Sequence, residues 1–273
     1  MGALLALASA LCYGIADYAG GLLSRRANPA AVALIGQASG FALAVLVAPF
    51  VPSPGVGLAD LGWGALSGIG TGTGMAFLYK GLSRGAMSVV VPVSAVGGVA
   101  LPVLVGVALL GDRPTPLAWS GIVVALPALW LVSRKRGAGT DPAAVPDALI
   151  ASAGIALQYL ALAQAAPSSG LWPIVAGRLA ATLAILPMAR SAERPPPRLR
   201  AAAALNGGIA ALALVCYLLS ARYQIVSIAV VLSSLYPAIP VLLGVTALRE
   251  RLTWPQAVGL LGAGAAIGLL TLS

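Results

Sequence analysis

The chain is a succession of apolar runs separated by short polar breaks, and most of these runs are long enough to cross a bilayer. A membrane-spanning helix needs about 20 apolar residues. Because lipid offers no hydrogen-bonding partner, each spanning run must satisfy its own backbone groups and is expected to be helical. The predicted spans are residues 3–23, 30–50, 60–79, 86–110, 116–132, 148–166, 171–189, 200–220, 225–248 and 256–272. The sequence therefore predicts an all-α integral membrane protein with ten transmembrane helices.

Charged side chains are too scarce to cover a water-exposed surface. They make up 8% of the 273 residues, whereas 60% of the residues are hydrophobic. A soluble domain carries about 25% charged residues. The chain has no histidine and only seven acidic residues, which argues against most metal-dependent and acid–base enzymes. We therefore expect no enzymatic activity, no cofactor and no metal site. Cys12 and Cys216 lie within apolar runs and are interpreted as small buried side chains.

The two halves of the chain are related by an internal repeat. A shift of 138 residues places Tyr79 on Tyr217, Arg84 on Arg222, Pro102 on Pro240 and Asp112-Arg113 on Glu250-Arg251. In so hydrophobic a sequence, apolar and small residues often match by chance. Prolines, arginines and acid–arginine pairs that match in one register are much harder to obtain by chance. We predict a duplicated five-helix unit, with a first repeat at residues 1–132, a basic cytoplasmic linker at 133–147 and a second repeat at 148–273.

Five helices per unit is an odd number, so the second repeat must enter the membrane upside down. The distribution of basic residues supports this inversion, because nearly all of them fall on one predicted face. The positive-inside rule assigns that face to the cytoplasm and leaves both termini outside. A composition rich in alanine, glycine and arginine suggests a bacterial inner membrane. The basic face holds Arg25, Arg26, Lys80, Arg84, Arg134, Lys135, Arg136, Arg190, Arg194, Arg198, Arg200, Arg249 and Arg251, and the other face holds Arg113 and Arg222.

A motif near the end of each repeat resembles the drug/metabolite transporter superfamily, specifically its EamA-type ten-helix members. The first copy is Pro102-Val103-Leu104, Gly111-Asp112-Arg113, Thr115 and Gly121, and the second is Pro237, Pro240, Arg249-Glu250-Arg251-Leu252-Thr253 and Gly259. The first copy has Asp112 where the family usually has glutamate. The resemblance covers essentially the whole chain. It implies two inverted five-helix repeats around a central cavity with alternating access, and it leaves the substrate open.

Asp17 is the one acidic residue deep within an apolar run, about two helical turns before Arg25. An ionisable group at this depth costs a few kcal/mol on insertion scales and usually faces a cavity or a partner. One interpretation is a carboxylate that binds a proton or a cation during transport. The other is a structural hydrogen bond or a fixed ion pair near the cytoplasmic entrance.

Arg178 is the one basic residue at a comparable depth, and Gln37 is its counterpart in the first repeat. Its guanidinium group is suited to bidentate contact with a carboxylate or phosphate of a substrate. It could equally neutralise Asp17, because a buried arginine needs a partner. A third hypothesis combines the two and makes Asp17 and Arg178 a pair that the substrate or a proton breaks.

Tyrosines are the candidates for lining the predicted cavity. Tyr13 lies about one turn from Asp17 and therefore on the same helix face. Tyr79 and Tyr217 are related by the repeat, so each is a candidate gate for one access state. The predicted set for substrate binding or coupling is Asp17, Arg178, Gln37, Tyr13, Tyr79, Tyr159, Tyr217 and Tyr236.

Inverted repeats with polar groups at mid-depth are typical of secondary transporters. The sequence lacks the phosphate-binding Gly-x-x-x-x-Gly-Lys-Ser/Thr motif, so ATP is not expected to drive transport directly. The leading hypothesis is a secondary transporter for a small polar or amphipathic metabolite, including export of amino acids and coupling to protons. The alternative is a flippase for a lipid-linked or isoprenoid-phosphate carrier. The expected partners are a small-molecule substrate, membrane lipids and protons, with no nucleic acid; both a monomer and a homodimer remain open.

Overall fold

The computed structural model describes residues 2–105, 115–133, 141–223 and 235–272, and every regular element in these ranges is helical. Short 3-10 turns at Ala48–Phe50 and Pro167–Ser169 follow α2 and precede α7. The first half contains α1 (Gly2–Ser24), α2 (Pro29–Val47), α3 (Leu58–Arg84), α4 (Met87–Val105) and α5 (Pro116–Ser133). The second half contains α6 (Ala144–Leu162), α7 (Trp172–Ala189), α8 (Pro197–Tyr223), α10 (Ala238–Thr246) and α11 (Trp254–Thr271).

Each predicted span corresponds to one of these helices, which confirms the all-α class. The ends of the predicted spans 86–110 and 225–248 lie partly outside the described residues. Helix α6 begins at Ala144, so its first turn includes residues 144–147 of the predicted linker. The reason is Asp147, whose buried carboxylate pairs with Lys80 at 3.2 Å and with Arg84 at 3.2 Å. A charge that appeared to mark a solvated loop is instead an ion pair that fixes the start of a helix.

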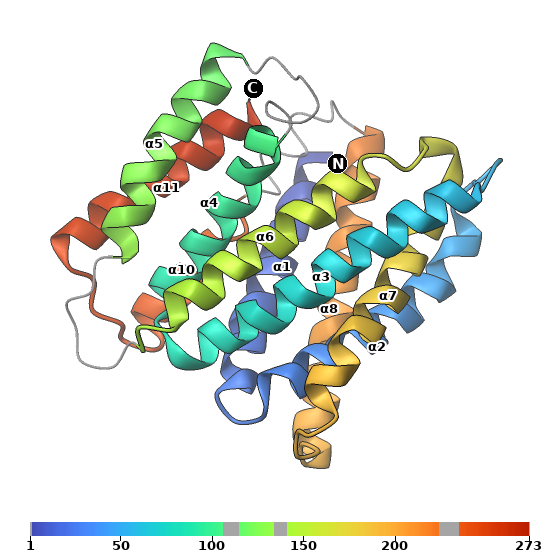
Figure 1. Cartoon of the computed structure of the whole chain (residues 1–273), viewed down its shortest axis with the longest axis horizontal. Coiled ribbons are helices and arrows are strands. Elements are labelled where there is room, and N and C mark those ends of the chain that lie inside the picture. Colours follow the sequence, from blue (N-terminus) through green and yellow to red (C-terminus); the bar gives the residue numbers. More distant parts are fainter. Residues whose placement is uncertain (1, 106–114, 134–140, 224–234, 273) are drawn as a thin grey trace.

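The packing of the helices shows that the two halves are equivalent and interlocked. Helix α3 packs against α6 and α7, and its counterpart α8 packs against α1 and α2, which are the matching helices of the other half (Figure 1). Helix α5 pairs with α11, and α4 contacts α10, so counterparts also meet directly. The predicted two-repeat architecture is therefore confirmed.

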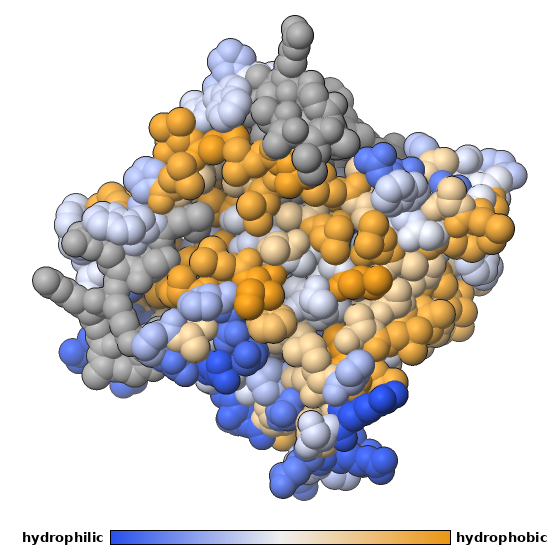
Figure 2. All heavy atoms as spheres, viewed as in Figure 1, coloured by the Kyte–Doolittle hydropathy of each residue, from blue (hydrophilic) through white to orange (hydrophobic). Residues whose placement is uncertain are grey.

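The two halves run in opposite directions along the bundle. Helix α1 ends at Ser24, next to Arg25, whereas its counterpart α6 begins beside Asp147 at the same end. We call this end the arginine-rich end; hydrophilic surface gathers there in the lower part of Figure 2. The first turn of α1 and the last turn of α11 lie toward the opposite end (Figure 1). Which membrane face holds the arginine-rich end stays a prediction from the charge distribution. The end comprises Arg25, Arg26, Lys80, Arg84, Arg190, Arg194, Arg198, Arg200, Arg249 and Arg251.

Helix α3 is central because glycines on two of its faces let neighbouring backbones approach. A Cβ at Gly64 or Gly68 would collide with backbone atoms of α7, and a Cβ at Gly70 would lie 2.6 Å from the Gly154 carbonyl oxygen of α6. Small residues at such positions are a common basis of helix association in membranes, where apolar burial gives little driving force. Glycine spacing thus sets the distance between the two repeats.

The same glycines lower the hydropathy of α3. Five of the described helices are long and apolar enough to cross a membrane by length and composition: Gly2–Ser24, Pro29–Phe50, Ala144–Leu162, Trp172–Ala189 and Pro197–Tyr217. Helix α3 is 27 residues long and is not among them. Gly64, Gly68 and Gly70 face protein rather than lipid, so the helix is held in the bundle by backbone contact more than by side-chain hydrophobicity.

The backbone contact of α3 predicts opposite effects of the same substitution at two glycines. We expect Gly68→Ala to destabilise the protein by about 1–3 kcal/mol, because the added methyl group overpacks the α3–α7 contact. A Cβ at Gly62 of the same helix meets nothing within 4 Å, so Gly62→Ala should be neutral or stabilise the protein by up to about 1 kcal/mol. The stabilities of both variants can be measured by thermal unfolding in detergent, with size-exclusion chromatography to quantify the protein that stays folded. Equal effects would contradict the contact.

Candidate functional site

Asp17 lies in the last third of α1 and is partly buried. Within the described residues its carboxylate makes neither an ion pair nor a hydrogen bond. Tyr13 is one turn before it, and Gly20 is one turn after it on the same helix face. Among the described residues this carboxylate has no fixed counter-ion, which favours an exchangeable partner.

Tyrosine side chains from several helices lie near enough to Asp17 to interact with it electrostatically. Its carboxylate interacts electrostatically with the hydroxyl groups of Tyr13, Tyr79, Tyr159 and Tyr236. The rings of Tyr13 and Tyr236 are in contact, with centroids 6.0 Å apart and planes inclined by 56°. Tyr217 interacts in turn with Tyr13 and Tyr159. The five predicted tyrosines therefore form one cluster, contributed by α1, α3, α6, α8 and the turn before α10, where the central cavity is predicted.

The repeat-related tyrosines Tyr79 and Tyr217 have different environments. Tyr79 is 4% exposed, and a Cβ at Gly20 would overlap its ring, so the ring lies directly against the α1 backbone. Its hydroxyl oxygen accepts a hydrogen bond of 3.1 Å from Nδ2 of Asn206 on α8. Tyr217 is only partly buried. The asymmetry follows at least in part from the sequence, because the amide that binds Tyr79 is Asn206, and the repeat position of Asn206 is the glycine Gly68.

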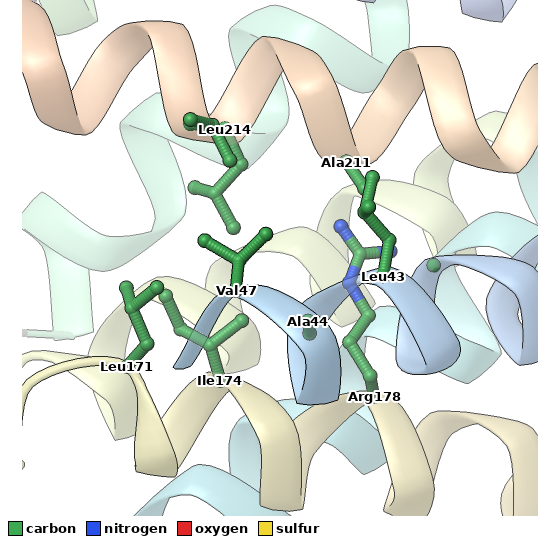
Figure 3. Close-up of a pocket in the computed structure, with 10 residues that line it drawn as sticks. Leu43, Ala44, Val47, Leu171, Ile174, Arg178, Ala211 and Leu214 are labelled. Atoms are coloured by element: carbon green, nitrogen blue, oxygen red, sulfur yellow. The ribbon is translucent and has the colours of Figure 1, made fainter. Parts of the chain in front are cut away.

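Arg178 extends from α7 toward α2 and α8 (Figure 3). Its Nη1 donates to Oε1 of Gln37 at 2.8 Å, and Gln37 is 4% exposed. The guanidinium group adjoins a cavity of about 20 Å³, enough for roughly one water molecule, whose other walls are apolar. Gln37 therefore holds and orients the cation without neutralising it. The cavity is lined by Gly40, Leu43, Ala44, Val47, Leu171, Ile174, Arg178, Ala211, Leu214 and Val215.

Asp17 and Arg178 do not form an ion pair within the described part of the chain. Both charges nevertheless act on the same two hydroxyl groups, those of Tyr13 and Tyr79. The structure thus brings all eight predicted residues into one region, with the opposite charges on separate helices. The paired state of the switch hypothesis is not the state observed.

The polar groups of the cluster determine which ligand chemistry it would suit. Among the described residues no group of three or more histidine, cysteine or acidic side chains could hold a metal ion. The polar groups at the cluster are instead a lone carboxylate, phenol hydroxyls, amides and one guanidinium. These groups suit a small organic molecule that carries both charges.

Comparison with known proteins agrees with the geometry. The profile of the EamA-like transporter family matches residues 1–134 and 144–272, which are the two halves of the fold. The chain belongs to the EamA-like transporter family. Membership makes it a multi-pass membrane transporter of small substrates. No curated protein matches this EamA-like transporter significantly. A solved structure, described only as the crystal structure of a protein, covers 100% of this chain and 99% of its own at 22% identity and a TM-score of 0.52, which supports the fold alone.

Asn206 is a polar residue of the EamA-like site that the sequence analysis did not single out. It is 4% exposed, and its Oδ1 has no hydrogen-bonding partner among the residues that the structure describes. A signal was present, because the chain has only two asparagines and Asn206 alone lies inside an apolar run. Its repeat position on α3 is a glycine, Gly68, so the internal symmetry gave no hint of a polar role.

The Tyr79–Asn206 contact predicts thermodynamic coupling between α3 and α8. Tyr79→Phe and Asn206→Leu should each destabilise the protein, by about 1 kcal/mol for the lost interhelical hydrogen bond. The double variant should cost less than the sum of the two, because either change alone leaves a buried polar group without a partner. The wild-type protein, the two single variants and the double variant form a double-mutant cycle. Their free energies of unfolding in mixed micelles give the coupling energy between Tyr79 and Asn206. Strict additivity would show that the hydrogen bond contributes nothing.

Proposed function

We propose that this protein is a secondary transporter that moves a small zwitterionic or amphipathic metabolite, such as an amino acid, by alternating access. One observation carries the proposal. Asp17 and Arg178 are opposite charges within the membrane domain that are not paired with each other in the described structure, yet both act on Tyr13 and Tyr79. A substrate with an ammonium group and a carboxylate would complement both.

The cost of an uncompensated charge favours such a substrate. A charged side chain at the centre of a membrane costs from about 2.5 kcal/mol upward, and an arginine bonded to a neutral amide retains its positive charge. A substrate carboxylate or phosphate could form two parallel hydrogen bonds with Arg178 while Gln37 holds the guanidinium in place. An ammonium group at Asp17 would compensate the other charge.

The tyrosine cluster suits the remainder of such a molecule. Aromatic faces attract an ammonium group, by about 0.5–2 kcal/mol, and also pack against apolar side chains. Tyr13 and Tyr236 present tilted rings beside Asp17. Tyr159 of α6 also interacts with Asp17, and 50% of its surface is exposed on the outside of the bundle. Selectivity would then come from the shape of this aromatic wall.

A flippase for a lipid-linked phosphate is the second candidate. The observation that favours it is the cavity between α2, α7 and α8, whose walls are apolar apart from Arg178. A phosphate could bind this arginine while the lipid chain stays among apolar side chains. This mode would use Arg178 and would not need a cation-binding group at Asp17.

The decisive experiment is counterflow in proteoliposomes. Purified protein should exchange at least one labelled amino acid with saturable kinetics, and analogues that lack either the amino group or the carboxylate should compete at least tenfold less well. We expect Asp17→Asn and Arg178→Gln each to lower exchange at least tenfold, because each removes the counter-charge of one substrate group.

The matched control is Arg190→Gln, which removes an exposed positive charge at the arginine-rich end and should leave exchange unchanged. Normal exchange in both Asp17→Asn and Arg178→Gln would contradict the proposed site. No exchange of any amino acid by folded protein, together with movement of a labelled lipid-linked phosphate, would instead favour the flippase.

Proton coupling through Asp17 is a separate expectation. If the carboxylate carries a proton in one half of the cycle, an imposed pH gradient should drive uphill accumulation of the exchanged substrate by the wild-type protein. Asp17→Asn should lose this accumulation. A pH-sensitive dye inside the vesicles reports the accompanying proton flux, and substrate movement without it would indicate transport along the substrate gradient alone.

A further inference from the structure

The arginine-rich end holds a carboxylate that joins the two repeats and that no feature of the proposed substrate site uses. Glu250 follows α10 of the second repeat, and its side chain reaches α4 of the first repeat. Oε1 accepts from the backbone N–H of Met87 at 2.8 Å, and Oε2 accepts from that of Ser88 at 3.0 Å. These two groups are the first donors of α4 and have no partner within their own helix. A carboxylate therefore caps the positive end of the α4 dipole.

Arg25 completes this contact from α1. Its Nη2 lies 3.8 Å from Oε1 of Glu250. Its Nε and Nη2 donate to the carbonyl oxygens of Leu82 and Gly85, each at 3.1 Å, at the end of α3. Glu250 and Arg25 thus connect α1, α3 and α4 to the segment between α10 and α11. We call these two residues with the first turn of α4 the Glu250 cap.

The backbone before Glu250 is held in an uncommon conformation. Arg249 has a φ of 55°, the only positive value of a non-glycine residue within the described ranges. Such a conformation is unfavourable for an arginine and persists only where surrounding contacts impose it. The N–H of Glu250 donates to the carbonyl oxygen of Gly244 at 3.0 Å. The turn is therefore fixed so that the carboxylate points at α4.

A tightly packed layer lies between Asp17 and this cap. Gly20 contacts the Tyr79 ring, and Gly21 lies against Met87 and Leu82, both of which are 0% exposed. On the other side of Asp17, Tyr159 is half-exposed. The site is thus closed toward the arginine-rich end in this conformation.

We propose that the Glu250 cap is the closing contact of the transport cycle at the arginine-rich end: Glu250 caps α4 while that end is closed and releases it when that end opens. In an inverted repeat, access changes when the repeats exchange conformations. A contact between α4 and the segment after its counterpart α10 must then break in the other state. The repeat partner of Glu250 is Asp112, which lies outside the described residues. The inference rests on the proposed transport function.

Thiol labelling tests the proposal without knowledge of the substrate. Ser88 is 3% exposed, so Ser88→Cys, in a chain that also carries Cys12→Ala and Cys216→Ala, places a reporter inside the closed end. We expect slow reaction with a small maleimide in this parent and at least tenfold faster reaction after Glu250→Gln. A glutamine presents an N–H₂ group toward one of the α4 donors and carries no charge to stabilise the helix dipole.

Asp147→Asn is the matched control, because it removes a second buried carboxylate at the same end. Asp147 pairs with Lys80 and Arg84 along the α3–α6 contact, and among the described residues its carboxylate makes no ion pair or hydrogen bond to α4. It should leave the labelling of residue 88 unchanged. Equal labelling rates in the parent and in Glu250→Gln, both folded by size-exclusion chromatography, would overturn the proposal whatever the substrate proves to be.

A reversible crosslink tests the cap independently of the stability of Glu250→Gln. A Cβ at position 244 would lie 3.3 Å from the Cβ of Met87, close to the spacing of a disulfide, about 3.5–4.5 Å. It would also lie 2.9 Å from Oε2 of Glu250, so the reference for this test is the reduced double variant and not the wild-type protein. Oxidation of Met87→Cys/Gly244→Cys should abolish counterflow, and reduction should restore it in the same sample. If the fully crosslinked protein exchanged substrate as fast as the same protein after reduction of the disulfide, this end would not need to open during transport. Loss of counterflow in Asp17→Asn together with unchanged labelling in Glu250→Gln would retain the transporter and reject the cap.

Discussion

Helix α3 lies against α6 and α7 at a distance that only residues without a side chain permit. The carbonyl oxygens of Gly177 and Gly154 occupy the space where the Cβ atoms of Gly68 and Gly70 would be. Lipid and protein interior are both apolar, so burial alone does not hold these helices together. Close van der Waals contact of the backbones does, and the position of Tyr79, Lys80 and Arg84 at the end of α3 follows from it.

The candidate site depends on this interlocking because neither repeat contains it. Asp17, Tyr79 and Gln37 come from the first repeat, whereas Arg178, Asn206 and Tyr236 come from the second. Tyr79 bonds across the interface to Asn206, and Gln37 bonds across it to Arg178. A small change in how the repeats pack would therefore move the two charges relative to each other, which is the geometric requirement for coupling substrate binding to a change of access.

The sequence alone predicted the all-helical class and the two repeats, because hydropathy and matched motifs are strong local signals. It also named the tyrosines that interact with Asp17, whose roles stay predictions. It did not predict which helix faces meet. Helices that contact lipid on one side and protein on the other are apolar all round, so periodicity does not reveal orientation. The sequence analysis therefore missed Asn206 and the Glu250 cap. Both depend on contacts between residues more than 120 positions apart in the chain. The ion pair of Asp147 was likewise hidden, and the predicted linker extended into α6.

The low hydropathy of α3 affects how this helix enters the membrane during synthesis. The ribosome completes α3, which ends at Arg84, well before it reaches α6 and α7, which span Ala144–Leu162 and Trp172–Ala189. During that interval the glycine faces of α3 have no partner, and the helix lacks the apolar side chains that would hold it in lipid on its own. We therefore expect insertion of α3 to depend on its neighbours, first α1 and α2 and then the second repeat, more than insertion of the five more apolar helices does.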